Sequence, residues 1–448
     1  MRFTTDQQTL DDLRLFGKGG DGSIYQLFNR TATRGGAAIL EEWFRYPLSD
    51  EKLINERSGI IRHFAQSGQP FPFRPELFDQ IEQYLADHDE RSRLTGREQS
   101  LKDKMSGLIA EDSEYKTIHQ GVAALVEMAH GLKALFGGDG FGAYRSEAAA
   151  LAELLNEPVF MQLLELPVRG KLSYEKVAVH DAHLRFRHRD SVRRLLGKIY
   201  HLDVYISVAA VARQRGFAFA EALPRDRQML RSEGLYHPSV PNAVPNNLAI
   251  TTGSNIIFLT GANMAGKSTF MKSLGIALFL AHMGLPVPAS SMVFSVRDAI
   301  YTTINLSDNL GAGASHFYAE VLRVKKVARE LSLGKSLFVI FDELFRGTNV
   351  KDAYEATVAL TSAFAGHKDS IFVISTHIIE AGDVLKERHD NIHFVFLPTR
   401  MQGDRPVYTY TLEKGITADR HGMIIINNEG ILEKLKNGKP KITKHNLV

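Results

Sequence analysis

The segment that most constrains the fold is FLTGANMAGKSTF, residues 258–270, in which a short apolar strand leads into a glycine turn and then a helix. It matches the pattern G-x-x-x-x-G-K-[ST] in the context that this pattern requires. Gly261 and Gly266 allow backbone N–H groups to turn inward around phosphate oxygens, and the start of the helix adds unpaired N–H groups and a positive dipole end. Lys267 is placed to reach the β- and γ-phosphates of a nucleotide, and Ser268 to offer a hydroxyl to Mg²⁺. The pattern predicts a nucleotide-binding loop rather than an ordinary glycine turn.

The whole loop is expected to contact ATP. Its residues are Gly261, Ala262, Asn263, Met264, Ala265, Gly266, Lys267, Ser268 and Thr269.

Composition narrows the remaining choices. The chain has 448 residues, which predicts two or three domains, and 44% apolar with 23% charged residues is typical of a globular protein. A formal net charge of +3 is close to balanced, so any contact with nucleic acid requires a local patch. The chain has no cysteine, which excludes disulfides, thiolate catalysis and cysteine-based zinc sites and fits a cytoplasmic location.

No membrane segment is expected. The first residues, MRFTTDQQTLDD, lack the apolar core of a signal peptide. The longest apolar run, GIALFLAHMG at 275–284, is too short to cross a bilayer, so we interpret it as the buried helix behind the loop.

The pattern of apolar residues divides the chain into two regions. Up to about residue 222, spaced apolar residues predict helices, at 23–28, 36–46, 75–86, 100–136, 146–166 and 193–213, with Ser49 or Asp50 capping a further helix and Trp43 in the core. After a Pro/Asn-rich connector at 236–247, strands alternate with helices. The strands are expected at 255–260, 299–305, 336–341, 371–376, 392–397 and 407–412, the last two as an antiparallel extension of a largely parallel sheet.

A basic segment, HLRFRHRDSVRR at 183–194, allows two interpretations. Several Arg and His residues around an aromatic residue suit contact with a phosphate backbone. The same charges also suit the solvated face of a helix start, and because a charge run alone is a weak signal we prefer that interpretation.

Polar residues that follow two other apolar runs complete the expected site. Asp342 and Glu343 end the run LFVIF, at the edge where open α/β sheets bind ligands. Asp342 suits the Mg²⁺ shell, together with Ser268, and Glu343 is placed to orient and deprotonate an attacking water. His377, after the run IFVIS and Thr376, would sense or polarise the γ-phosphate.

A further anion-binding element lies between these motifs. In SDNLGAGASHFYAEV a glycine-containing loop leads to Ser315 at a helix start. One chain does not need two such helix ends, so Ser315 is expected to face the γ-phosphate held by a second subunit, with ATP in a two-fold symmetric interface.

These four elements, in this order, resemble the MutS family of DNA mismatch-repair ATPases. The family's TGPNMGGKST is similar to TGANMAGKST at 260–269, DELGRGT to 342–348, its serine loop to 307–320 and its Thr-His to Thr376 and His377. The segment at 412–423 resembles the family's helix-turn-helix, and residues 31–57 resemble its core domain. Four residues depart from the family pattern, namely Ala262, Ala265, His316 and Phe345 in place of Pro, Gly, Thr and Gly.

The resemblance implies a multidomain fold, with an α-helical core and lever domain at 1–235 followed by an α/β P-loop (ABC-type) ATPase domain with a C-terminal dimerisation segment at 236–448. It implies an ATPase that uses ATP and Mg²⁺, with Glu343, His377 and Lys267 as catalytic residues. A mismatch-reading domain and a connector have no counterpart here, so a short form of the family is expected and mismatch recognition does not carry over.

The leading hypothesis is therefore an ATP-driven, homodimeric switch that acts on DNA, with a repair protein as a further partner. The alternative is a scaffold held together by nucleotide, with little turnover and no DNA binding. A transporter ATPase and a small-molecule kinase are disfavoured, because neither a membrane-coupling segment nor a substrate lid is evident.

Overall fold

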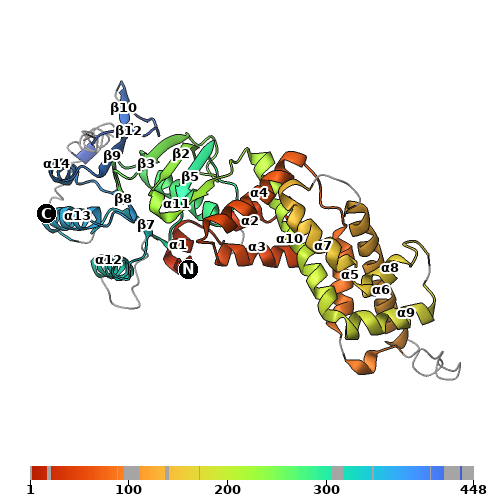
Figure 1. Ribbon diagram of the computed structural model, residues 1–448. Helices are drawn as coiled ribbons and strands as arrows, with labels where there is room; N and C mark the ends of the chain where they lie inside the picture. The colour runs from red at the N-terminus through yellow and green to blue at the C-terminus, as the bar shows by residue number, and fades with distance from the viewer. Residues whose placement is uncertain are drawn as a thin grey trace, which may run out of the picture. The chain divides into compact units, whose positions relative to one another are not determined.

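The protein is described here by a computed structural model (Figure 1). It describes residues 3–17, 22–87, 89–94, 110–136, 141–170, 172–304, 316–345, 348–403, 405–417 and 434–435. The chain forms two compact units. Unit 1 comprises Met1–Gly22, Tyr46–Asn55 and Phe217–Val448, and unit 2 comprises Ser23–Arg45 and Glu56–Gly216. The helical unit is thus inserted into the sequence of the α/β unit, whereas the sequence predicted a single division at residue 235.

Unit 2 is helical. Its elements are α2 (Ile24–Phe28), α3 (Arg34–Arg45), α4 (Glu51–Ser67, which starts in unit 1), α5 (Pro75–Ala86), η1 (Glu90–Ser92), α6 (Ala110–Phe136), η3 (Gly142–Tyr144), α7 (Arg145–Leu155), α8 (Pro158–Leu164), α9 (Tyr174–Asp181), η4 (Ala182–Arg187) and α10 (Arg189–Arg215). Most predicted helices are confirmed, including the Asp50 cap on α4 and the buried Trp43. The long helix predicted from 100 is confirmed over α6, and its first ten residues lie outside the described part.

One predicted helix is wrong. The segment 146–166 forms two helices, α7 and α8, because Pro158 cannot donate a backbone hydrogen bond and disfavours helical geometry in the residue before it. Pro158 instead occupies the first position of α8, where a missing N–H costs nothing.

A buried carboxylate joins two helices of unit 2. Asp203 of α10 accepts hydrogen bonds from the backbone N–H groups of Ala32 (3.0 Å) and Thr33 (2.8 Å) and from the Thr33 hydroxyl (2.7 Å). These donors precede α3, whose N-terminal N–H groups have no partner within the helix. Asp203 thus anchors the start of α3 on α10.

Helix α10 is long and apolar enough to span a membrane, the one such helix among the residues described. However, 72% of its most apolar stretch is buried inside the protein. This is the behaviour of a core helix in a packed bundle.

Unit 1 contains two main sheets. The larger has the order β12-β9-β4-β8-β7-β6, with all pairs parallel except β12 with β9. Its strands are β4 (Ile256–Gly261), β6 (Ala299–Thr303), β7 (Leu337–Asp342), β8 (Ile371–Ser375), β9 (Ile392–Leu397) and β12 (Glu413–Lys414). The smaller has the order β1-β5-β2-β3, with β1 (Glu221–Leu223), β2 (Leu230–Leu235), β3 (Asn246–Ile250) and β5 (Ser291–Ser295).

The sequence predicted the positions of β4, β6, β7, β8 and β9 and missed the smaller sheet. It assigned 392–397 to an antiparallel extension, which is wrong, because β9 pairs in parallel with β4. The sixth predicted strand, 407–412, is wrong. Instead, β10 (Thr399–Gln402) and β11 (Arg405–Tyr408) form a separate hairpin, and β12 pairs with β9. Tyr410 interrupts the run with a left-handed backbone (φ 56°), which an extended strand cannot contain.

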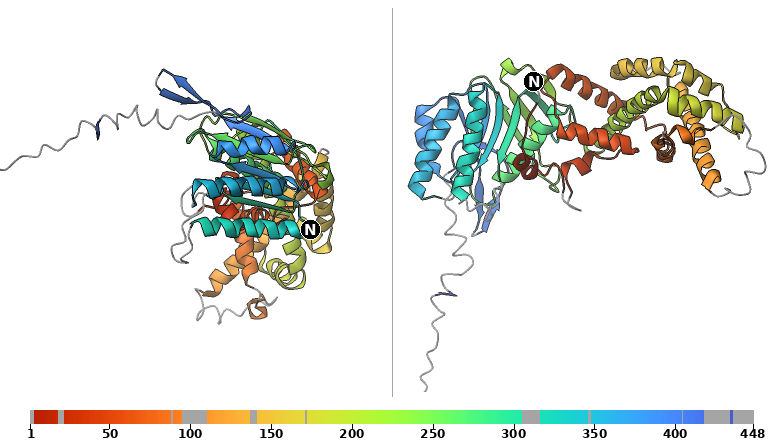
Figure 2. Two further views of the ribbon diagram at one scale, coloured as in Figure 1. Left: turned by 90° about the vertical axis from the view of Figure 1, so that its left-hand side faces the viewer. Right: turned by 90° about the horizontal axis from the view of Figure 1, so that it is seen from below.

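Helices cover both faces of the larger sheet. Alternate strand residues such as Phe258, Val339 and Phe372 pack with α12 (His316–Ser332), α13 (Val350–Ala365) and α14 (Ile379–Arg388), which lie side by side in Figure 2. Helix α11 (Lys267–His282) packs against the other face, where Gly275 approaches Ile340. This layering places the carboxyl ends of β4, β7 and β8 together at one edge.

The N-terminal residues 3–15, which include α1 (Gln7–Asp12), attach to the free edge of β6, and we call them the N-terminal strap. Thr4 pairs with Ala299 in parallel, and the Asp12 carboxylate accepts hydrogen bonds from the Thr302 hydroxyl (2.7 Å) and the Ile304 N–H (2.9 Å). The strap thereby belongs to the α/β unit rather than to the helical region in which the sequence placed it.

Candidate functional site

The glycine loop joins β4 to α11. At its start Gly261 has φ 147°, and a Cβ there would lie 3.0 Å from the Leu397 carbonyl oxygen. At its end Gly266, with φ 102°, is the N-cap of α11 and lies against the Tyr410 ring. Both positions require glycine, since an L side chain is strained at these φ values and has no free space.

Lys267, the first residue of α11, turns back over the loop. Its Nζ donates hydrogen bonds to the carbonyl oxygens of Gly261 (2.9 Å) and Ala262 (3.2 Å), and the residue is only 5% exposed. A buried ammonium held against the loop is placed to interact with anionic groups that the loop encloses.

Ser268 and Asp342 meet at the end of β7. The Ser268 hydroxyl donates to Asp342 Oδ2 at 2.6 Å, and Asp342 is buried. Hydroxyl and carboxylate oxygens are hard ligands that suit Mg²⁺. Among the residues described, no group of three or more His, Cys, Asp or Glu side chains could hold a metal by itself. The pair therefore fits an ion that completes its shell with phosphate and water.

Glu343 and His377 form a second pair beside the loop. His377 Nε2 lies 2.5 Å from Glu343 Oε1 and 3.3 Å from Lys267 Nζ. The shorter contact favours the tautomer in which Nε2–H donates to the carboxylate, and that nitrogen cannot also accept from the lysine. Glu343 has a left-handed backbone (φ 56°) while its N–H still bonds the Ser375 carbonyl (2.9 Å), so the strained turn starts directly where β7 ends.

The structure thus brings Lys267, Ser268, Asp342, Glu343 and His377 together around one loop. Asn263 and Met264 lie in the same loop, with Met264 77% exposed. Ser315 lies outside the described residues, and α12 begins directly after it.

The departures from the family pattern differ in their consequences. Ala262 and Ala265 do not have positive φ, so alanine is accommodated there without strain. Phe345 does have a left-handed backbone, with φ 65°, at the position where the family pattern has glycine. Its ring is 5% exposed and packs at 5.6 Å from the Phe317 ring, which offsets the backbone strain.

A cavity of about 580 Å³ opens beside the loop and extends the site beyond the residues that the sequence indicated. Its wall includes Val244, Asn246 and Tyr410. The Asn246 amide donates to the Tyr410 carbonyl (2.9 Å), and its oxygen accepts from the Leu412 N–H (2.7 Å). Asn246 and Tyr410 are far apart in sequence, and the only available signal was the Pro/Asn-rich connector, which suggested irregular backbone.

The fold and site define a class: a helical unit combined with an α/β unit that carries a glycine loop of the nucleotide-binding pattern. Two family models match this chain, MutS domain III over residues 8–209 and MutS domain V over residues 257–443. Together they account for most of the sequence, and the chain belongs to the MutS family.

Several curated relatives are called DNA mismatch repair proteins. The MutS protein of Fusobacterium nucleatum is 28% identical over 57% of this chain and 29% of its own length, and that of Lawsonia intracellularis is 31% identical over 60% and 29%. The MSH7 protein of Arabidopsis thaliana is 25% identical over 95% of this chain and 43% of its own length. The chain thus spans less than half of the length of these relatives.

Proposed function

We propose that the protein binds and hydrolyses ATP and uses the nucleotide cycle to switch its conformation on DNA, as a homodimer in DNA repair. The observation that carries the proposal is the convergence of two pairs, Ser268 with Asp342 (2.6 Å) and Glu343 with His377 (2.5 Å), on the glycine loop. A loop alone would support nucleotide binding, whereas the two pairs add a metal position and a base.

The loop and Lys267 hold the phosphates in this proposal. Backbone N–H groups and the start of α11 supply fixed positive ends, and the Lys267 ammonium moves from the loop carbonyls to the phosphate oxygens. Ser268 and Asp342 would hold Mg²⁺, which would supply charge neutralisation for the phosphates of the nucleotide.

Glu343 acts as the base that orients and deprotonates the attacking water. His377 positions this carboxylate through the Nε2–H hydrogen bond and senses the γ-phosphate from the end of β8. The strained backbone of Glu343 supports this role, because strained residues are retained where their geometry is needed.

The cavity beside the loop is proposed to receive the base of ATP. Its volume suits a group of that size, and Tyr410 offers an aromatic face next to Gly266. The Asn246 hydrogen bonds hold this wall in place.

Other parts of the proposal depend on the family. In the dimer Ser315 faces the γ-phosphate of the partner subunit. The relatives named above are DNA mismatch repair proteins, which supports DNA as the substrate of the switch and a repair protein as a further partner. The cytoplasmic location stays a prediction from the absence of cysteine.

A steady-state ATPase assay with Glu343→Gln tests the proposal. The change keeps the size of the side chain and removes the base, so turnover is expected to fall by about 10²–10⁴-fold with ATP still bound. Glu355→Gln on α13 is the matched control, since Glu355 is exposed and lies away from the loop, 3.9 Å from Lys351. Unchanged turnover in Glu343→Gln would refute the base, and a wild-type protein that binds ATP without turnover or DNA binding would indicate the scaffold alternative.

Two further variants separate the remaining roles. Lys267→Ala is expected to weaken ATP binding itself. Ser315→Ala is expected to act in trans, so that mixed dimers with a Lys267 variant regain part of the activity. Equal loss in all mixtures would contradict a shared site.

A further inference from the structure

The basic segment at 183–194 includes part of an unusual helical turn. η4 is a π-helix between α9 and α10, in which the His188 N–H donates to the His183 carbonyl at 2.8 Å. This spacing of five residues places His183 and His188 on one side, with their rings 6.1 Å apart and edge to face. Single π turns are rare and are frequent at functional sites.

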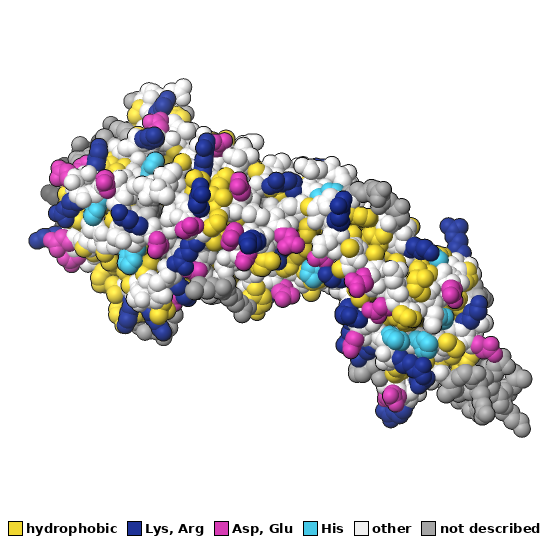
Figure 3. All heavy atoms as spheres, in the orientation of Figure 1, with side chains coloured by type: hydrophobic (Ala, Val, Ile, Leu, Met, Phe, Trp, Pro, Cys, Tyr) yellow, Lys and Arg dark blue, Asp and Glu magenta, His cyan; other side chains and the backbone are white. Residues whose placement is uncertain are grey.

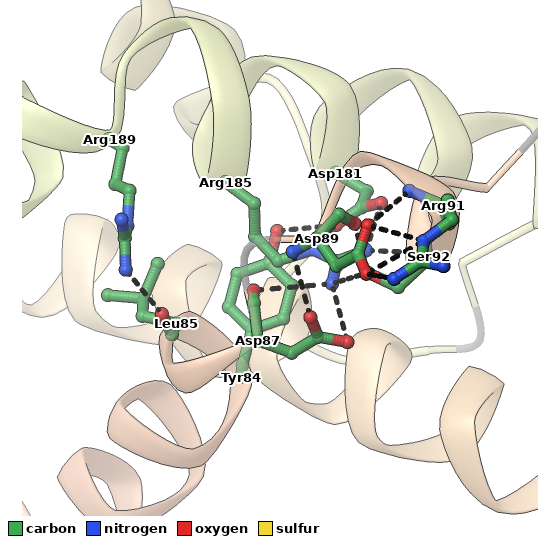
Figure 4. Close-up of polar contacts among 9 residues, drawn as sticks. All are labelled: Tyr84, Leu85, Asp87, Asp89, Arg91, Ser92, Asp181, Arg185 and Arg189. Carbon is green, nitrogen blue, oxygen red and sulfur yellow. Dashed lines mark hydrogen bonds and ion pairs between the residues drawn. The ribbon is translucent and has the colours of Figure 1, made fainter.

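Arg185 holds this turn in place (Figure 4). Its side chain is 1% exposed and forms two hydrogen bonds to Asp181, at 2.5 and 2.8 Å, and two to Ser92, both at 3.0 Å. The Tyr84 hydroxyl also donates to Asp181, at 3.0 Å. The preferred interpretation of the sequence placed this segment on a solvated face, and for Arg185 that interpretation is wrong. Arg185 fastens the segment around η1 to the π turn.

This fastening brings cations together. The ring of His183 is partly desolvated, and the positive charges of Arg187, His188 and Arg93 act on it as well, so the pKa of His183 is lowered. Arg93, Arg187 and His188 are exposed, and they come from two segments about ninety residues apart in sequence. We call these three residues and His183 the cationic patch, and Figure 3 shows His and Lys/Arg side chains gathered in this way near α9.

Two neighbouring carboxylates are paired with other arginine residues. Asp87 lies 3.7 Å from Arg185, and Asp89 forms an ion pair with Arg91 at 2.6 Å. On the other elements near His183, α9 contributes His180, η1 contributes the exposed Glu90, and the first turn of α10 contributes the exposed Asp190. The four residues of the patch itself are all basic, although the chain as a whole is nearly neutral.

We infer that the cationic patch binds phosphate groups of a nucleic-acid backbone. The inference rests on the proposed action on DNA and assigns a contact surface for it. Guanidinium and imidazole N–H groups are hydrogen-bond donors that suit phosphate oxygens. Because Arg185 holds the π turn in place, less conformational entropy is lost when the patch binds a ligand. Collecting like charges at the end of a helical unit is unfavourable by itself, and a polyanion relieves the repulsion.

If the cationic patch binds phosphate, its affinity should depend on pH, because His183 takes up a proton on binding. A phosphate beside His183 stabilises its protonated form and so opposes the desolvation and the surrounding cations that lower its pKa. Binding is therefore expected to tighten as the pH falls from 7.5 to 5.5.

The experiment measures the affinity of the full chain for a fluorescent 30-base-pair duplex by anisotropy between 50 and 200 mM salt. Arg187→Ala and Arg93→Ala are each expected to weaken binding about 5- to 10-fold at low salt, and to reduce the slope of log affinity against log salt by about 0.9. His183→Gln is expected to remove part of the pH dependence. Arg194→Ala is the matched control, because Arg194 belongs to the same basic segment but is paired with Glu157 at 3.1 Å.

The outcomes separate the inference from the proposed function. If the wild type binds the duplex and the patch variants bind equally well, with unaltered circular dichroism, the patch is refuted and the proposed function stands. If the wild type does not bind nucleic acid at 50 mM salt but binds polyglutamate through the patch, the ligand is an acidic protein and the inference is overturned, together with the DNA part of the proposed function.

Discussion

The backbone conformation of Phe345 predicts which of two substitutions, alanine or glycine, lowers the free energy of unfolding more, and by how much. Its φ of 65° lies in the left-handed region, which costs a non-glycine residue about 1–2 kcal/mol. Its buried side chain stabilises the fold, and truncation of a buried Phe costs about 3–5 kcal/mol. We therefore expect Phe345→Ala to lose about 3–5 kcal/mol, and Phe345→Gly to lose less, because glycine removes the strain as well as the ring.

At ordinary helical positions the order is reversed, since alanine is more stable than glycine by up to about 1 kcal/mol. Phe317 is the matched control, because its ring packs against that of Phe345 but its backbone belongs to α12. Urea unfolding of the four variants gives the two differences. The reasoning is refuted if alanine is more stable than glycine at both positions.

For other changes the structure also predicts whether the stability of the protein rises or falls. Burial lowers the pKa of His282 to about 3, so this ring stays neutral in the folded protein. The free energy of unfolding should therefore fall by up to about 1.4 kcal/mol per pH unit as the pH decreases from 6.5 toward 3. In thermal unfolding, the melting temperature of His282→Gln should depend less steeply on pH over this range. Burial raises the pKa of Asp6, but the hydrogen bond and charge of Arg323, followed by the hydrogen bond of Lys326, outweigh this effect and lower the pKa to about 2. The stability that Asp6 contributes is therefore present above pH 3.8 and is lost as the pH falls toward 2. In urea unfolding at pH 7, Asp6→Asn should lower the free energy of unfolding by about 1–2 kcal/mol. Gly121→Ala should destabilise unit 2, because its Cβ would overlap the Tyr84 ring, whereas Gly197→Ala in α10 meets nothing within 4 Å and should raise the melting temperature.

The core of the site could be predicted because it is built from strand ends. The residues that follow β4, β7 and β8 are adjacent in parallel strands, so Lys267, Asp342 and His377 had to meet once the strands were recognised. Apolar runs such as LFVIF identify buried strands without any knowledge of the rest of the chain.

What the sequence did not show depends on distant pairing. Tyr410 reaches the loop through Asn246, a contact between residues 164 positions apart. From its sequence neighbours Arg185 was interpreted as a surface charge, and its burial depends on partners that include Ser92, 93 positions away. Short strands such as β1 gain their stability from pairing with β5, so they carry too little local signal to be recognised.

The N-terminal strap has a consequence for how this protein is made. Its Thr4 and Asp12 leave the ribosome almost three hundred residues before β6, their partner. The inserted helical unit can fold in the interval, as a chain segment that is already complete. A fragment cloned from residue 217 onward would keep both sheets but leave the edge of β6 without its strap, and an exposed strand edge is a template for aggregation. Such a fragment is expected to precipitate unless residues 3–15 are supplied as a peptide or fused to it.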